Sequence, residues 1–366
     1  MDVSKYQEIE KYYFNFIGKN YSKNKALRNI ALRIGLEFND LEKAEYYLNQ
    51  IILKNNEDYK EYLFLGGVYM KLGLLEKGWK YYKYRTLSAN YNCLKNDFNL
   101  EKEWKGENLI NKTIYILAEQ GIGDCIMWSR YLPLFKNCNI KLYVKYNYWK
   151  KIIPILDYVL RLTAGNNNLV ITDTVDKYDY WIFLGDLTYI FKINFKNWLP
   201  FYEYIKPDEK IIKLWKNRLK IYKKNKLIGI NCTGLYGLND NRRIDVDDIK
   251  KLLDNSKNKF INLNIEHEIN HENVIKHGFE IDKKVSFLDT AGIMKNLDLF
   301  ITVDTSLVHL AGAMKIPTIL LLIKDSEWRW FNTNKCYWYP TVKIFRQKEN
   351  NWNGLNEYLK KIINEL

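Results

Sequence analysis

The feature that most constrains the fold is a series of short apolar runs beginning near Lys112. The runs are "TIYILA", "KLYVKY", "YWIFL", "KLIGINC", "KFINLNI", "DLFITV" and "TILLL", with helical patterns such as "DVDDIKKLL" and "TAGIMKN" between several of them. Wholly apolar strands that alternate with helices are typical of parallel sheets covered by helices on both faces. The sequence therefore predicts an α/β fold, and ligands in such folds bind beyond the carboxyl ends of the strands.

The α/β pattern is interrupted once, at the polar and aromatic stretch "NFKNWLPFYEYIKPDEK". This break predicts two lobes of ordinary domain size, residues 106–205 and residues 206–366, the second ending in a helix.

The first part of the chain, residues 1–105, has a helical pattern with an internal repeat. "LEKAEYY" begins at Leu41 and "LEKGWKYY" begins at Leu75, 34 residues later. That period is typical of the tetratricopeptide repeat, a helix–turn–helix unit, and Gly73 and its counterpart Asn39 suit the turn. Such arrays usually need about three repeats to bury a core, so we expect these helices to pack on segments that follow.

Composition narrows the functional classes. The net charge is +14, but the lysines are scattered, with neither a dense basic run nor a zinc-finger spacing, which argues against a nucleic-acid binder. The beginning of the chain is polar and unlike a signal peptide, and the longest apolar runs are too short to cross a bilayer. The five cysteines are widely spaced and form no CxxC motif, so we expect reduced thiols and a cytoplasmic protein.

The first candidate site segment, "AEQGIGDCIMWSRYLPLF", follows the first strand and contains Glu119, Gln120, Gly121, Gly123 and Asp124. It lacks the third glycine of a dinucleotide-binding loop. The aspartate has a purely structural interpretation, in which it stabilises the start of a helix. The same negative charge weakens the attraction of that helix start for an anion, which favours an acceptor or base site over a phosphate site.

The second segment, "NCTGLYGLNDNRRIDVDDI", carries Arg242 and Arg243 ahead of a helix capped by Asp245. Arginines at such a place suit diphosphate oxygens. The alternative is a solvated loop in which they pair with nearby aspartates, and the sequence leaves the choice open.

The third segment is "LDLFITVDTSLVHLAGAMKIPTILLL". A buried strand is expected to end at Asp304, and a helix to begin with Thr305 and Ser306, where free amides and hydroxyls form an anion site. His309 lies on the same helical face and is able to donate to a phosphate, although a core histidine is the alternative.

Two further patterns have simpler explanations. "HEINH", from His267 to His271, matches the zinc-protease motif, but it follows a strand and lacks a long amphipathic helix, so a surface loop is expected. The aromatics Trp328, Trp330, Trp338 and Tyr339 suit stacking on a base or sugar, and equally the packing of loops onto a core.

Taken together, the loop "EQGIGDCIMWSRYLP", the strand and helix "VDTSLVHLAGA" and the tail "WRW…WYPTVKIFRQ" resemble bacterial proteins that join tetratricopeptide repeats to a heptosyltransferase-like glycosyltransferase of family 9. The resemblance implies the GT-B fold, two Rossmann-like lobes with a cleft between them. It also implies inverting sugar transfer from a nucleotide-sugar donor without a metal or cofactor.

Carried over by position, the resemblance makes Asp124 the general base, in the loop formed by Glu119, Gln120, Gly121 and Gly123. Asp304, Thr305, Ser306 and His309 would bind the ribose or phosphates of the donor, with Arg242 on the same side. Arg243 stands where the family has serine, and "GLYGL" replaces the usual loop before it. The repeats would present the acceptor, a protein or a surface glycan.

The altered loop keeps an alternative function open: a catalytically inactive GT-B and repeat scaffold used for protein interaction. A zinc hydrolase and a nucleic-acid binder are the remaining alternatives, resting on "HEINH" and on net charge respectively.

Overall fold

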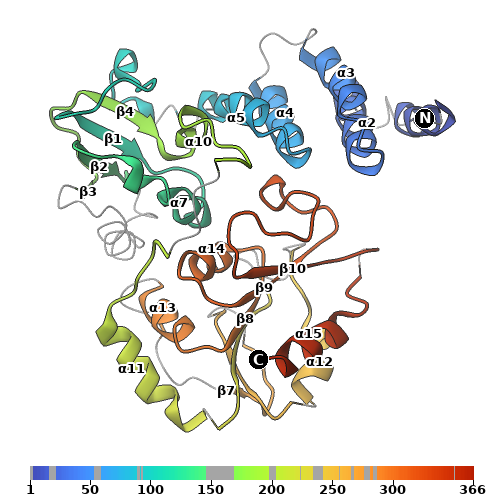
Figure 1. Ribbon diagram of the computed structural model, residues 1–366, viewed down its shortest axis with the longest axis vertical. Helices are drawn as coiled ribbons and strands as arrows, with labels where there is room; N and C mark the ends of the chain where they lie inside the picture. The colour runs from blue at the N-terminus through green and yellow to red at the C-terminus, as the bar shows by residue number, and fades with distance from the viewer. Residues whose placement is uncertain are drawn as a thin grey trace. The chain divides into compact units, whose positions relative to one another are not determined.

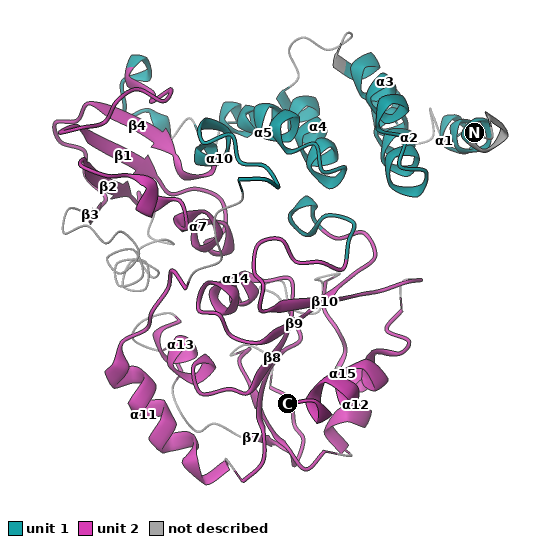
Figure 2. Cartoon of the chain, viewed as in Figure 1, with its two compact units in different colours: residues 1–101, 186–198, 327–333 teal, residues 102–185, 199–326, 334–366 magenta. Residues whose placement is uncertain are grey.

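The computed structural model describes residues 3–15, 22–52, 59–88, 91, 94–145, 169–197, 203–222, 224–233, 242–254, 256–264, 268–275, 281–282, 287–349 and 351–366. The chain forms two compact units (Figure 2). The helical unit comprises Met1–Glu101, Asp186–Trp198 and Glu327–Thr333, and the α/β unit comprises Lys102–Gly185, Leu199–Ser326 and Asn334–Leu366.

The helical unit begins with α1 (Val3–Phe14), α2 (Lys23–Glu37), α3 (Leu41–Ile52), α4 (Tyr59–Lys71) and α5 (Leu75–Tyr82) (Figure 1). Helix α2 packs on α3, and α4 packs on α5. Asn39 lies in the turn between α2 and α3, and Gly73 lies in the turn between α4 and α5. Both residues have positive φ, which confirms the predicted turn positions. A β-carbon on Gly66 would lie 2.7 Å from the backbone nitrogen of Tyr82, so a glycine is needed where α4 meets α5.

Later segments of the chain complete the core of the helical unit, as expected for a short helical array. These later segments include α10 (Leu187–Ile190) and the 3₁₀ turn η7 (Trp328–Trp330). A further 3₁₀ turn, η1 (Lys83–Leu87), follows α5 directly. The Trp79 indole donates to the carbonyl of Ile193 at 2.8 Å, and its ring meets the edge of Trp328. Arg85 forms a 2.7 Å ion pair with Asp186, with both side chains only 3% exposed.

The α/β unit contains two parallel sheets, as predicted. The first has the order β3-β2-β1-β4, formed by β1 (Thr113–Leu117), β2 (Asn139–Tyr143), β3 (Leu169–Thr172) and β4 (Tyr180–Phe183). Helix α7 (Ile122–Ser129) follows β1, and the 3₁₀ turns η3 (Leu132–Leu134) and η4 (Leu184–Asp186) follow α7 and β4.

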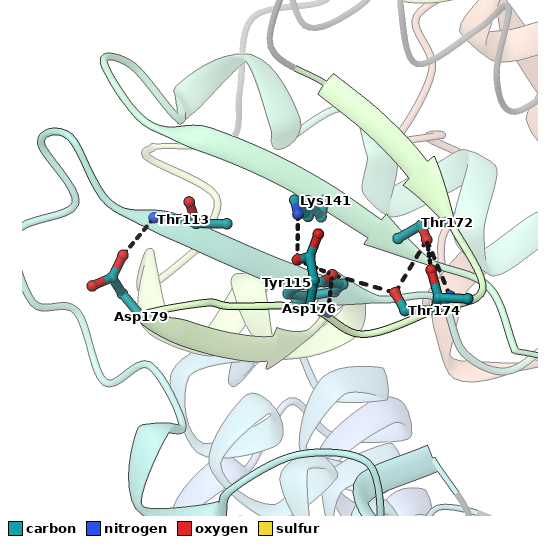
Figure 3. Close-up of polar contacts among 7 residues, drawn as sticks. All are labelled: Thr113, Tyr115, Lys141, Thr172, Thr174, Asp176 and Asp179. Carbon is teal, nitrogen blue, oxygen red and sulfur yellow. Dashed lines mark hydrogen bonds and ion pairs between the residues drawn. The ribbon is translucent and has the colours of Figure 1, made fainter.

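Polar contacts attach the connection between β3 and β4 to the first sheet (Figure 3). The Tyr115 hydroxyl donates to the Asp176 carboxylate at 2.9 Å and accepts from the Asp176 amide at 3.1 Å. Lys141, beside Tyr115 in the sheet register, pairs with the same carboxylate. At the start of β1, the Thr113 amide donates to Asp179 at 2.8 Å. These contacts hold the connection against β1 and β2.

The second sheet has the order β10-β9-β8-β5-β6-β7 and is parallel throughout. Its strands are β5 (Leu227–Asn231), β6 (Lys259–Asn262), β7 (Val274–Ile275), β8 (Leu299–Val303), β9 (Thr318–Leu322) and β10 (Val342–Arg346). Helices α12 (Val246–Asp254) and α15 (Leu355–Asn364) pack together on one face, and α11 (Glu209–Leu219) and α13 (Leu288–Met294) pack together on the other (Figure 1). Helix α14 (Ser306–Ala313) follows β8.

Among the described residues, no helix combines the length and the apolar character that crossing a membrane requires.

Candidate functional site

The candidate site lies where two helices begin, α7 after β1 of the first sheet and α14 after β8 of the second. Both belong to the α/β unit, and they pack against each other (Figure 1). The carboxyl ends of one strand from each sheet therefore lead into the same contact. Ligands of open α/β sheets bind at such strand ends.

The loop into α7 is fixed by two carboxylates. Glu119 is 1% exposed, and its Oε1 accepts a 2.9 Å hydrogen bond from the amide of Gly185, so it joins the end of β1 to the segment after β4. Gln120 has a φ of +59°, and Gly121 is the N-cap of α7. The Gly121 amide donates to Oδ2 of Asp124 at 3.1 Å. Asp124 thus has the capping geometry that the structural interpretation of this aspartate expects.

Gly123 places the first turn of α7 directly against α14. A β-carbon there would lie 2.7 Å from Cδ2 of His309 and 3.2 Å from the α-carbon of Ser306. No larger residue fits without movement of one helix. The structure therefore brings together three of the residues that the sequence proposed, from segments about 180 positions apart.

The start of α14 is organised by Thr305, the N-cap, whose hydroxyl accepts from the amide of Leu307 at 3.3 Å. Strand β8 ends at Val303, one residue before Asp304, which is 7% exposed. Asn231, the last residue of β5, donates to the hydroxyls of Thr302 and Thr305 at 3.1 and 3.2 Å. This asparagine supports the helix start and was not among the predicted site residues, although it opens the second candidate segment.

His309 is 4% exposed and has two distinct sides. Its Nδ1 lies 2.9 Å from the hydroxyl of Tyr339, and its Nε2 is on the side of Gly123. Burial raises the pKa of the Tyr339 hydroxyl well above its usual range. Gly312 is also required here, because a β-carbon on it would lie 2.2 Å from the Tyr339 ring.

The aromatic tail packs inside the protein. Trp330, Trp338 and Tyr339 are each 1% exposed, and Trp328 meets Tyr82 edge to face. Their surroundings agree with the packing of loops onto a core, one of the two interpretations that the sequence allowed.

Arg242 lies in the segment that leads from β5 into α12. Arg243 pairs with Asp245, as the solvated-loop interpretation expects of these arginines. The loop "GLYGL" lies outside the described residues.

The described part of "HEINH", residues 268–271, contains no helix, in agreement with the surface-loop interpretation. The His271 imidazole lies 2.8 Å from a carboxylate oxygen of Asp254. His267 lies outside the described residues.

A comparison with protein families finds a match within the second half of the chain. Residues 257–351 match the family model of glycosyltransferase family 9 (heptosyltransferase), and this range includes Asp304, Thr305, Ser306 and His309. The match supports a glycosyltransferase.

Three individual proteins are similar over larger parts of the chain. Protein FlbA of Caulobacter vibrioides is 25% identical over 304 residues, which cover 76% of this chain. The chain spans about half the length of that relative. A glycosyl transferase family 9 structure from Veillonella parvula aligns with 72% of this chain and all of its own at a TM-score of 0.48 and 11% identity. The E. coli ADP-heptose LPS heptosyltransferase II aligns with 69% of this chain and 99% of its own at a TM-score of 0.47 and 11% identity.

Proposed function

We propose that the chain is an inverting, metal-independent glycosyltransferase of the GT-B type. It transfers a sugar from a nucleotide-sugar donor to an acceptor at the contact between α7 and α14. The observation that carries the proposal is the direct packing of the two helix starts at Gly123, with the α14 start inside the segment that matches family 9.

The α14 start supplies the donor side. Its first amides and the hydroxyl of Ser306 suit the diphosphate of a nucleotide sugar, because a helix N-terminus attracts anions. His309 adds a ring nitrogen on the side that faces α7. Stabilising the negative charge that develops on the leaving diphosphate is the main catalytic task when no metal takes part.

The α7 start supplies the acceptor side. Its Asp124 carboxylate neutralises the positive helix end, which disfavours a second phosphate site there. A carboxylate at this place is suited to remove the proton of an acceptor hydroxyl as the sugar is transferred. The loop from Glu119 to Gly123 holds Asp124 in position.

The N-terminal helices present the acceptor in this proposal. The 34-residue spacing of α3 and α5 supports a tetratricopeptide-like arrangement, whose surface suits an extended partner such as a polypeptide, with a surface glycan as the second acceptor class. The cysteines among the described residues are free, which fits a cytoplasmic setting.

The test is release of nucleoside diphosphate from UDP-, ADP- and GDP-sugars by the full chain, with and without candidate acceptors. Asp124→Asn keeps an oxygen able to accept from the Gly121 amide, so the cap survives while the base is removed. We expect turnover by the unaltered chain and a loss of at least about a hundredfold in the variant, with donor binding retained. Donor binding without turnover in the unaltered chain would instead favour the inactive scaffold. Equal turnover in the variant would remove Asp124 as the base.

A further inference from the structure

A chain of buried polar groups runs from the end of α7 to His309. Arg130, the C-cap of α7, points its guanidinium Nη2 at the hydroxyl of Tyr204 at 3.4 Å. The Tyr204 hydroxyl lies 3.4 Å from the hydroxyl of Tyr339, which lies 2.9 Å from Nδ1 of His309. Two of the three contacts are long, and all lie within the α/β unit.

The surroundings of Arg130 keep its guanidinium in place. It is 4% exposed, its Nε donates to the carbonyl of Met127 at 2.9 Å, and its Nη1 donates to the carbonyl of Trp338 at 3.0 Å. The rings of Tyr204, Trp338 and Tyr339 lie within 5.3 Å of the guanidinium carbon, the distance range of cation–π attraction. Tyr204 itself is held by its segment, since the amides of Tyr204 and Ile205 both donate to the carbonyl of Ala313.

The chemistry of these groups fixes which of them donates in each hydrogen bond. A guanidinium only donates, so the oxygen of Tyr204 accepts from Arg130. The single proton of Tyr204 then points to Tyr339, and the single proton of Tyr339 points to Nδ1 of His309. Burial raises the pKa of Tyr339 well above its usual range, which keeps that proton on the hydroxyl. A neutral imidazole that accepts at Nδ1 carries its own proton on Nε2.

We propose that Arg130, Tyr204 and Tyr339 are positioning residues that hold His309 as the Nε2–H tautomer, with that N–H on the side of α7. The assignment of the tautomer rests on the hydrogen-bond chain alone. The use of the N–H as a donor to a diphosphate oxygen rests on the proposed function. Diphosphate oxygens only accept, so the opposite tautomer would turn a lone pair toward the ligand.

The tautomer is measured directly by long-range ¹⁵N–¹H NMR of the full chain labelled in histidine. The chain has four histidines, and the signals that disappear in His309→Gln are those of His309. We expect one His309 tautomer, protonated on Nε2. Tyr204→Phe keeps the ring and removes the hydroxyl that orients Tyr339, so we expect it to produce a mixture of tautomers, and Tyr339→Phe to remove the preference.

Tyr337→Phe is the matched control. It also removes a tyrosine hydroxyl, two residues before Tyr339, but the Tyr337 ring lies against Lys335. It should leave the His309 signals unchanged. An Nδ1-protonated His309 in the unaltered chain, or a Tyr204→Phe spectrum identical to it, would overturn the proposal. A purely structural role for these tyrosines would change stability without changing the tautomer.

Calorimetric titration with UDP, ADP and GDP separates this proposal from the proposed function. For whichever nucleotide binds, we expect Tyr339→Phe to weaken binding roughly tenfold and Tyr337→Phe to leave it unchanged. The predicted tautomer without binding of any nucleotide would support the hydrogen-bond chain and contradict the transferase. Nucleotide binding with the opposite tautomer would support the transferase and contradict the hydrogen-bond chain.

Discussion

Gly123→Ala tests the contact on which the site depends. The added β-carbon would lie 2.7 Å from Cδ2 of His309 and 3.2 Å from the α-carbon of Ser306, whereas carbon atoms in contact prefer about 3.5–4.0 Å. The His309 ring is buried and bonded to Tyr339, so it has little freedom to turn away. We therefore expect α7 and α14 to separate by somewhat less than about 1 Å.

The free-energy cost follows from two opposing effects. Overpacking of a well-packed interior costs about 1–3 kcal/mol, and the better helix propensity of alanine returns at most about 1 kcal/mol. Gly123→Ala should therefore lower the free energy of unfolding by roughly 1–2 kcal/mol and weaken nucleotide binding through the displaced helix starts.

Urea unfolding followed by tryptophan fluorescence measures this loss as a lower transition midpoint, and calorimetry measures nucleotide affinity on the same sample. Because the chain has two units, the midpoint is assigned to the α/β unit by comparison with a substitution in the helical unit. An unchanged midpoint together with unchanged nucleotide affinity would refute the close packing of α7 on α14.

Three other substitutions test separate features. Gly67→Ala in α4 places a β-carbon at an ordinary 3.9 Å from Trp328, so it should raise the stability of the helical unit by up to about 1 kcal/mol in the same urea assay, and a loss would contradict that spacing. Asp186→Ala leaves the buried guanidinium of Arg85 without its carboxylate and should cost about 3–5 kcal/mol, so a loss below about 1 kcal/mol would be inconsistent with a buried pair. Burial raises the pKa of Asp282 from 3.8 to about 6, so the folded state binds this proton more tightly than the unfolded state, and stability should fall as the pH rises from about 4 to about 6, by at most about 3 kcal/mol. Asp282→Asn should flatten that slope in urea titrations at several pH values, and an unaltered slope would assign the pH dependence to other groups.

The strands that could be predicted from the sequence are buried at most of their positions. All seven predicted runs form strands, and β5, β8 and β9 are buried at every position. The strands not predicted differ in character. β10 alternates buried with exposed or half-exposed residues, β7 has only two residues, and β3 is buried only at its first position. A continuous apolar run signals a central strand, and an edge strand gives a weaker signal.

The site was partly predictable for a related reason. Asp124 and Ser306 each stand just after a strand and at a helix start, so position along the chain identifies them. Tyr204 and Tyr339 are 135 residues apart, and Arg130 lies 74 residues before Tyr204. No local pattern marks three residues that meet only in the folded chain. For the same reason, the aromatic tail gave two interpretations that the sequence alone did not separate.

Thermal unfolding against a panel of nucleotide sugars and free nucleotides measures whether the α14 start binds a nucleotide sugar. A ligand at about a hundred times its dissociation constant adds roughly 2.7 kcal/mol to the free energy of unfolding. We expect a stabilisation of several degrees confined to one nucleotide class, and a much smaller one in Ser306→Ala, which removes a hydroxyl at the first position of α14. No stabilisation by any nucleotide, or equal stabilisation of both proteins, would contradict the assignment of the donor site to this helix start.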